Sequence, residues 1–175
     1  MKKDWQLARA AAAALRKAIF HWESSTAEPV PALHETLAAA LERVGDLEGC
    51  IREAKKSMAA QTSANAYYQV GRCEDGLGRF ASAQEAYRKA IHDSTEDDHR
   101  IRAGAWARLA ALKRFVAGDP DEAAMRAALP SSGDHKKYLL FALGKAREDN
   151  GDYEGAFQYF EQGRTTAAAG SRLPN

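Results

Sequence analysis

The stretch Gly45-Asp-Leu-Glu-Gly-Cys50 has two close copies, Gly78-Arg-Phe-Ala-Ser-Ala83 and Gly151-Asp-Tyr-Glu-Gly-Ala156. Each copy has a glycine, a polar residue and a large apolar residue in succession, with a small residue three positions further on. A weaker fourth copy begins at Gly118, and the four glycines are separated by 33, 40 and 33 residues. A period of this length is typical of stacked helix–turn–helix units. The sequence therefore predicts an all-α fold, a right-handed superhelical stack of antiparallel helix pairs with about nine helices.

The composition agrees with a folded helical chain and excludes two classes of partner. Of the 175 residues, 45% are hydrophobic and 28% are charged, and the formal net charge is +1. A charge this close to zero provides no general attraction to nucleic acid or to an anionic membrane surface. The chain has no run of about 18 apolar residues that could cross a bilayer. We expect a cytoplasmic protein that binds neither nucleic acid nor membrane.

The repeated glycines have a local explanation. A helix commonly ends in a left-handed backbone conformation that glycine adopts at little cost. Gly45, Gly78, Gly118 and Gly151 all stand where the first helix of a pair must stop and reverse. Two further glycines, at 71 and 144, fall inside predicted helices and indicate close approach of a neighbouring helix.

The apolar periodicity and the turn residues divide the chain into one N-terminal helix and four helix pairs. The N-terminal helix covers 4–22, and the prolines of 23–31 make that segment a linker. The expected pairs are 32–44 with 47–60, 63–77 with 80–93, 98–117 with 120–129, and 134–150 with 153–168.

These helices define the expected domain organisation. Residues 1–30 are an N-terminal helix and linker that pack on the stack, and 170–175 are a frayed tail. The stack itself covers 31–169, in units at about 31–62, 63–96, 98–130 and 134–169. The third unit carries seven extra residues, which must bulge from the stack or lengthen its helices.

The N-terminal helix has one apolar stripe, which needs a partner. Its members recur at spacings of three and four: Trp5, Ala8, Ala12, Leu15, Ile19 and Trp22. The stripe either packs on the neighbouring helix of the stack or forms the seam of a homodimer.

Two of the units resemble a known repeat family. The second unit reads Tyr67-x-x-Val70-Gly71 and then Gly78-x-Phe80-x-x-Ala83-x-x-x-Tyr87, and the fourth reads Leu140-x-x-Leu143-Gly144 and then Gly151-x-Tyr153-x-x-Ala156-x-x-x-Phe160. Both resemble the tetratricopeptide repeat (TPR), in which small residues stand where helices touch. The resemblance departs from the family pattern at Glu74 and Arg147, where an aromatic residue is usual.

A narrower resemblance is visible in the segment from Phe141 to Phe157. It is similar to the last repeat before the catalytic domain in bacterial TPR–sulfotransferase proteins. The resemblance implies an accessory domain that presents substrate, with the catalysis located in another part of such a protein.

The sequence shows no catalytic or metal-binding constellation. The five histidines do not form His-Glu-x-x-His, and no His/Cys cluster has the spacing of metal ligands. Cys50 and Cys73 lack C-x-x-C spacing and are expected to be buried free thiols. We therefore expect a chain that is not an enzyme and that needs no metal or cofactor.

The TPR resemblance implies a binding groove lined by the first helix of each pair. On helix 63–77, Asn65, Tyr68, Gln69, Arg72 and Asp75 share a face that differs from the apolar stripe, and the first four are expected to contact a peptide. With their counterparts on the later units, the predicted peptide-binding residues are Asn65, Tyr68, Gln69, Arg72, Arg108, Leu112, Phe141 and Lys145.

This groove leads to the principal functional hypothesis, a scaffold that recognises a protein or peptide. The Tyr68 ring beside the Arg72 guanidinium is expected to hold an extended peptide. The alternatives are an ordinary solvated surface, the accessory domain of a sulfotransferase, and a self-associating structural module.

Overall fold

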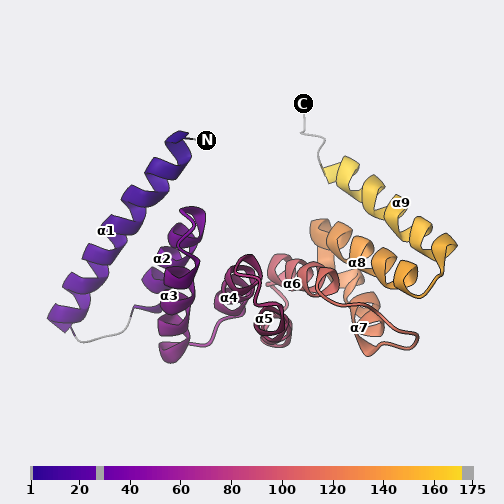
Figure 1. Ribbon diagram of the computed structural model, residues 1–175, viewed down its shortest axis with the longest axis horizontal. Coiled ribbons are helices and arrows are strands. Elements are labelled where there is room, and N and C mark those ends of the chain that lie inside the picture. Colours follow the sequence, from indigo (N-terminus) through magenta and orange to yellow (C-terminus); the bar gives the residue numbers. More distant parts are fainter. Residues whose placement is uncertain (1, 27–29, 171–175) are drawn as a thin grey trace. The chain divides into compact units, whose positions relative to one another are not determined.

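The computed structural model describes residues 2–26 and 30–170, and all regular structure within these residues is helical. The chain divides into two compact units, one ending at Ala90 and the other beginning at Ile91, and each is described by itself. The prediction of an all-α fold built from helix pairs is confirmed (Figure 1). None of the helices in the described ranges is both long enough and apolar enough to span a bilayer.

The first unit contains α1 (Lys2–Thr26), α2 (Pro31–Arg43), α3 (Leu47–Ala60), α4 (Ala64–Gly76) and most of α5 (Phe80–His92). Consecutive helices pack on one another from α1 to α4. Their core combines the alanines of α1 with larger residues of α2 and α3. Its members include Ala12, Ile19, Leu37, Leu41, Cys50 and Ile51.

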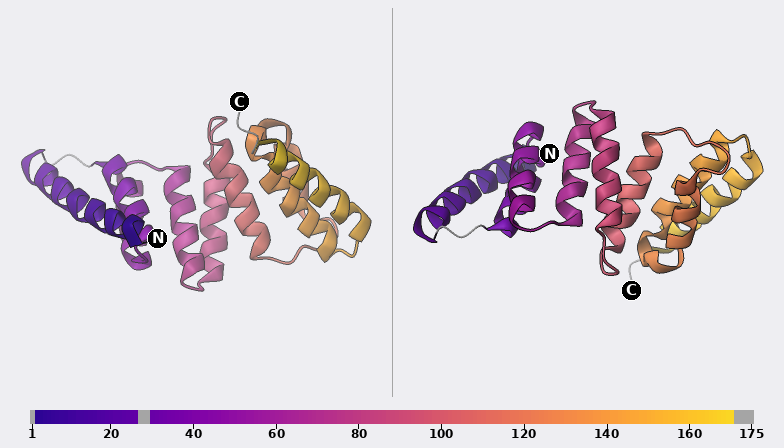
Figure 2. Two further views of the ribbon diagram at one scale, coloured as in Figure 1. Left: turned by 90° about the horizontal axis from the view of Figure 1, so that it is seen from above. Right: turned by 90° about the horizontal axis from the view of Figure 1, so that it is seen from below.

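The second unit contains α6 (His99–Ala111), α7 (Pro120–Ala128), a 3₁₀ segment η1 (Pro130–His135), α8 (Lys136–Asp149) and α9 (Tyr153–Gly170). Helix α8 is the centre of this unit, since α6, α7 and α9 all pack on it. Both views of Figure 2 show α8 and α9, coloured orange to yellow, running side by side.

The glycine corners form as predicted. Gly45, Gly78, Gly118 and Gly151 have φ angles of 83°, 74°, 78° and 78°, which lie in the left-handed region. At three corners the following aspartate, Asp46, Asp119 or Asp152, then caps the next helix. The Asp46 carboxylate accepts a hydrogen bond from the Gly49 amide at 2.9 Å, and Asp152 accepts one from the Gly155 amide at 2.9 Å. Helix end and helix start are thus specified by adjacent residues.

The glycines inside helices also act as predicted. A Cβ atom at Gly71 would lie 2.5 Å from the Tyr87 ring of α5, and one at Gly144 would lie 2.3 Å from the Phe160 ring of α9. In each case the aromatic ring of the partner helix occupies the space that a side chain would need. Glycine at these positions allows the two helices of a pair to approach closely.

The predicted end of the first helix and the linker 23–31 need correction. Helix α1 continues to Thr26, and α2 begins at Pro31. The polar residues after position 22 continue the helix, and their hydroxyls bond to carbonyls one turn earlier. Ser24 Oγ donates to the Phe20 carbonyl at 2.6 Å, and Ser25 Oγ donates to the His21 carbonyl at 2.9 Å. Residues 27–29 and the predicted frayed tail beyond residue 170 lie outside the described residues.

The apolar stripe of α1 packs within the chain. Ala8, Ala12 and Ile19 are buried, and α1 packs on α2. The structure therefore favours the first of the two predicted alternatives. The buried centre of this stripe cannot also form a homodimer seam.

The predicted helix 98–117 is too long, because α6 ends at Ala111. The extra residues form a loop that folds back onto α8. Phe115 is 2% exposed, and its amide donates to Asp149 Oδ2 at 3.0 Å. The Lys113 ammonium, 4.6 Å from the centre of the Phe115 ring, binds Asp119 and Asp121 at 2.7 Å each.

Candidate peptide-binding surface

Helix α4 presents Tyr68 and Arg72, one turn apart. The Arg72 guanidinium carbon lies 5.8 Å from the centre of the Tyr68 ring, and the side chain remains half-exposed. Its Nη2 atom also lies 2.6 Å from Oε1 of Glu42 on α2. The Tyr68 ring in turn lies 5.9 Å from the Tyr87 ring. The aromatic and the cation are therefore held in place by neighbouring helices, and both reach the surface.

The two amides predicted to face a peptide are more constrained. Asn65 Nδ2 donates to Oε2 of Glu35 on α2 at 2.8 Å. Gln69 is buried, and its Oε1 atom has no hydrogen-bond partner in the described structure. The Asn65 amide is therefore oriented by a carboxylate of the preceding helix pair. Asn65 and Arg72 both tie α4 to α2 through acidic partners.

The sequence analysis did not place Glu42 in the site. Its side chain is largely buried and pairs with Arg72 from a position 30 residues earlier in the chain. The signal that could have identified this pair is an acidic residue near the C-terminal end of α2, the first helix of the preceding helix pair. That signal is weak, because acidic residues occur throughout the chain.

The second unit contains the other four predicted residues. Arg108 is exposed near the end of α6. Leu112, the first residue after that helix, is half-buried. Phe141 on α8 is half-exposed, and its ring lies 6.3 Å from the Phe160 ring. A Cβ atom at Gly163 would lie 3.2 Å from the Phe141 ring, so this aromatic also packs against α9.

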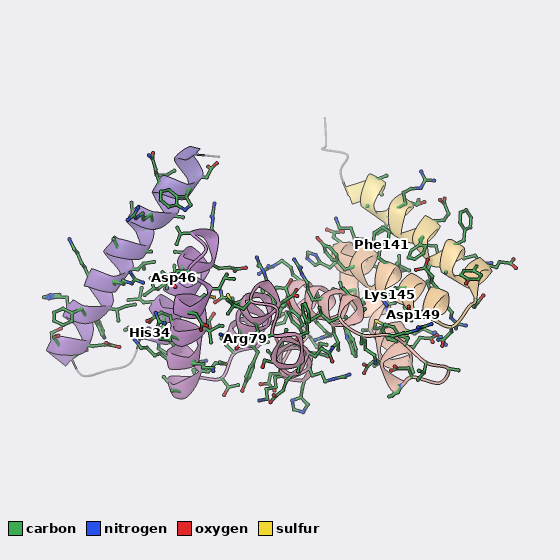
Figure 3. The ribbon with its side chains drawn as sticks, in the orientation of Figure 1. His34, Asp46, Arg79, Phe141, Lys145 and Asp149 are labelled. Atoms are coloured by element: carbon green, nitrogen blue, oxygen red, sulfur yellow. The ribbon has the colours of Figure 1, made fainter. Side chains whose placement is uncertain are left out.

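Lys145 holds the loop between α6 and α7. Its ammonium donates to the Lys113 carbonyl at 2.9 Å and lies 2.5 Å from Asp149 Oδ2 (Figure 3). Burial raises the pKa of Asp149, but hydrogen bonds from Lys145 and the Phe115 amide more than offset this, so the pKa lies below its usual value. This predicted groove residue therefore has a structural role in stabilising the loop.

The structure adds one cavity that the sequence analysis did not identify. An apolar groove of about 380 Å³ lies between α1 and α2 in the first unit. Its walls are mainly leucine and alanine side chains, with Asp4 and Arg43 as the charged residues. The lining residues are Asp4, Leu7, Ala8, Ala11, Leu15, Thr36, Ala39, Ala40 and Arg43.

The two thiols lie in the interior of the first unit. Cys50 and Cys73 are buried free cysteines, as predicted. The contact with Cys50 and burial both raise the pKa of the Cys73 thiol, which therefore stays neutral. Within residues 2–26 and 30–170, no three His, Cys, Asp or Glu side chains cluster so that they could hold a metal ion.

Comparison with known proteins identifies the repeat in two segments. Residues 64–91 and 138–163 match the family model of the tetratricopeptide repeat. These segments correspond to α4 with most of α5 and to α8 with much of α9, the two units in which the sequence resemblance is strongest. The TPR prediction is confirmed for them. No curated protein matches the chain.

Solved structures share the fold at low sequence identity. A crystal structure of MamA has 20% identity and a TM-score of 0.71, covering 98% of this chain and 94% of that one. The structure of BtubC from P. vanneervenii has 17% identity and a TM-score of 0.71, covering 96% of this chain and 76% of that one. A second MamA structure has 18% identity and a TM-score of 0.64, covering 100% and 99%. At these identities the similarity shows the fold alone.

Proposed function

We propose that this chain is a non-catalytic scaffold that binds a protein or an extended peptide, and that α4 supplies the central contacts. The observation that carries the proposal is the half-exposed Arg72 guanidinium, stacked on Tyr68 and anchored by Glu42. A guanidinium and a phenol that are already held in position lose little conformational freedom on binding. The two TPR segments support a recognition role, since stacked helical repeats form extended binding surfaces.

The chemistry of this surface suits a peptide backbone with an acidic or amide-bearing side chain. Arg72 offers guanidinium donors beside a ring face, and a ligand carboxylate would compete with Glu42 for them. Asn65, fixed by Glu35, presents its amide on the same face of α4. Within the second unit, Arg108, Leu112 and Phe141 offer charged and apolar side chains of their own, and Lys145 supports the loop between α6 and α7.

The test is a pull-down from the native host with the double variant Arg72→Glu, Tyr68→Ala. A matched control exists on the same hairpin. Tyr67 and Lys89 form a second aromatic–cation pair at 5.7 Å, so Tyr67→Ala, Lys89→Glu makes the same two chemical changes outside the proposed face. We expect the first variant to lose a partner that the control retains. If both variants recover the same partners, the α4 assignment is wrong.

A second candidate function is the accessory domain of a bacterial sulfotransferase, which the resemblance of Phe141–Phe157 favours. In that role the chain would present substrate to a catalytic domain. The test is the gene itself. A reading frame that stops after Asn175, with no sulfotransferase encoded nearby, removes this candidate.

A further inference from the structure

The face of α3 that carries Leu47 and Ile51 is covered by the next helix along the chain. A Cβ atom at Gly76 of α4 would lie 2.9 Å from Leu47 Cδ1. Ile51 is 5% exposed and belongs to the core cluster that includes Val70 and Cys73 of α4. In this unit, the second helix of a pair therefore packs against the first helix of the following pair.

Helix α9 has the same positions without that cover. Tyr153 and Phe157 stand two and six residues after Gly151, as Leu47 and Ile51 stand after Gly45. Tyr153 is 72% exposed and Phe157 is 64% exposed. The adjoining face of α9 packs against α8, where Phe160 meets Gly144. Helix α9 thus presents to solvent the pair of apolar positions that α3 buries.

The chain also carries a helix face suited to cover such aromatics. On α1, a second apolar stripe follows spacings of four, three, four and four residues, and every member is exposed: Leu7, Ala11, Ala14, Ala18 and Trp22. It shares Trp22 with the stripe that packs on α2, and its other members lie on the adjoining face of the helix. Because alanines dominate its centre, it allows a partner helix with large aromatic side chains to approach closely. Leu7 and Ala11 also line the apolar groove between α1 and α2.

The charges of the two helices are complementary. Helix α1 contains five basic and two acidic residues. Helix α9 contains two acidic residues and one basic residue. Glu154 directly follows Tyr153, and Glu161 lies one turn after Phe157. Opposite charge around two apolar faces favours their encounter and disfavours pairing of α1 with α1.

We propose that the α9 face of one copy of this chain, centred on Tyr153 and Phe157, packs against the exposed α1 stripe of a second copy. In this contact, α9 takes the place that α3 has within the first unit. Helix α1 of the second copy takes the place of α4, which covers α3. Because the two surfaces differ, a copy that uses one of them in a contact still offers the other to a further copy. Such head-to-tail contacts build either a closed ring of copies or an open row.

The first experiment measures mass by light scattering over a concentration series of the full chain. Wild-type mass is expected to rise with concentration. Phe157→Glu and Ala11→Glu each place a carboxylate in the contact and should weaken association at least tenfold. Both positions are exposed, so the circular dichroism spectrum should not change. The controls Gln158→Glu and Ala13→Glu alter exposed sites on other sides of the same helices and should associate like the wild type.

A mixture of the two variants provides the decisive test. The Phe157→Glu chain retains its α1 stripe, and the Ala11→Glu chain retains its α9 face. An equimolar mixture should therefore form a one-to-one dimer with twice the chain mass and grow no further. A wild-type chain that stays monomeric up to the highest soluble concentration overturns the proposal. So does a mixture in which the two variants fail to pair.

Discussion

The Nδ1 atom of His34 on α2 lies 2.7 Å from Oε2 of Glu53 on α3. The imidazole is 3% exposed, and its Nε2 atom lies 3.0 Å from Oε1 of Glu23 on α1. Both ring nitrogens are therefore within hydrogen-bond distance of a carboxylate oxygen, each from a different helix. The His34 ring, labelled in Figure 3, thus connects α2 with α1 and α3 in the first unit.

Replacing Glu53 by glutamine should destabilise the first unit in a pH-dependent manner. Burial raises the pKa of Glu53, but hydrogen bonds from His34 and Lys56 more than offset this and hold the pKa below its usual value of 4.5. A lowered pKa stabilises the fold above pH 4.5, and this stabilisation is lost as the pH falls through the folded-state pKa. We expect Glu53→Gln to cost about 1–3 kcal/mol at pH 7.

The measurement is urea unfolding followed by circular dichroism at pH 7 and in acid. The difference between wild type and variant should shrink below pH 4.5. Glu85→Gln is the control, because Glu85 is exposed and pairs with Lys89 on the surface of the same helix. An equal effect at both pH values would contradict the role assigned to the Glu53 carboxylate.

Adding a methyl group at Gly144 should destabilise the α8–α9 pair. The new Cβ atom would lie 2.3 Å from the Phe160 ring, so the two helices or the ring must move. Alanine improves helix propensity by about 1 kcal/mol, and overpacking costs about 1–3 kcal/mol. We expect a lower melting temperature for Gly144→Ala. The second change Phe160→Leu should recover part of the loss, and a single variant more stable than wild type would refute this account.

Asp149→Asn should loosen the loop between α6 and α7. The substitution removes the charged acceptor shared by Lys145 and the Phe115 amide. Limited trypsin digestion followed by mass spectrometry should then show faster cleavage after Lys113 or Arg114. Asp134→Asn, at an exposed position in η1, should leave the rate unchanged. Equal cleavage of both variants would show that Asp149 does not hold this loop.

The two cysteines should react slowly with thiol reagents in the folded protein. Contact with Cys50 and burial raise the pKa of Cys73, and both side chains are inaccessible. We expect both thiols of the chain to react with an aromatic disulfide reagent only after denaturant is added. Stoichiometric reaction within seconds under native conditions would contradict the buried arrangement.

The sequence predicted the features that depend on neighbouring residues. The glycine corners and the close helix contacts at Gly71 and Gly144 depend on the backbone freedom and small size of glycine. Both properties can be read directly from the residue type. The two clearest TPR units were predicted for the same reason.

The sequence did not predict the features that depend on distant partners. The end of α6 at Ala111 is set by contacts of the following loop with Asp149, which lies 34 residues after Phe115. The pairing of Asn65 with Glu35 spans 30 residues. Periodicity assigned Asn65 and Lys145 to an exposed face, but it could not show that carboxylates of the same chain bind them.

The aspartate caps at the corners have a consequence for how the chain folds. Asp46 bonds to Gly49 and Asp152 bonds to Gly155, so each corner is completed by residues only three positions apart. Contacts this local need little loop closure and form quickly. The α2–α3 and α8–α9 hairpins should therefore nucleate independently, and synthesis of the later hairpin need not precede folding of the earlier one.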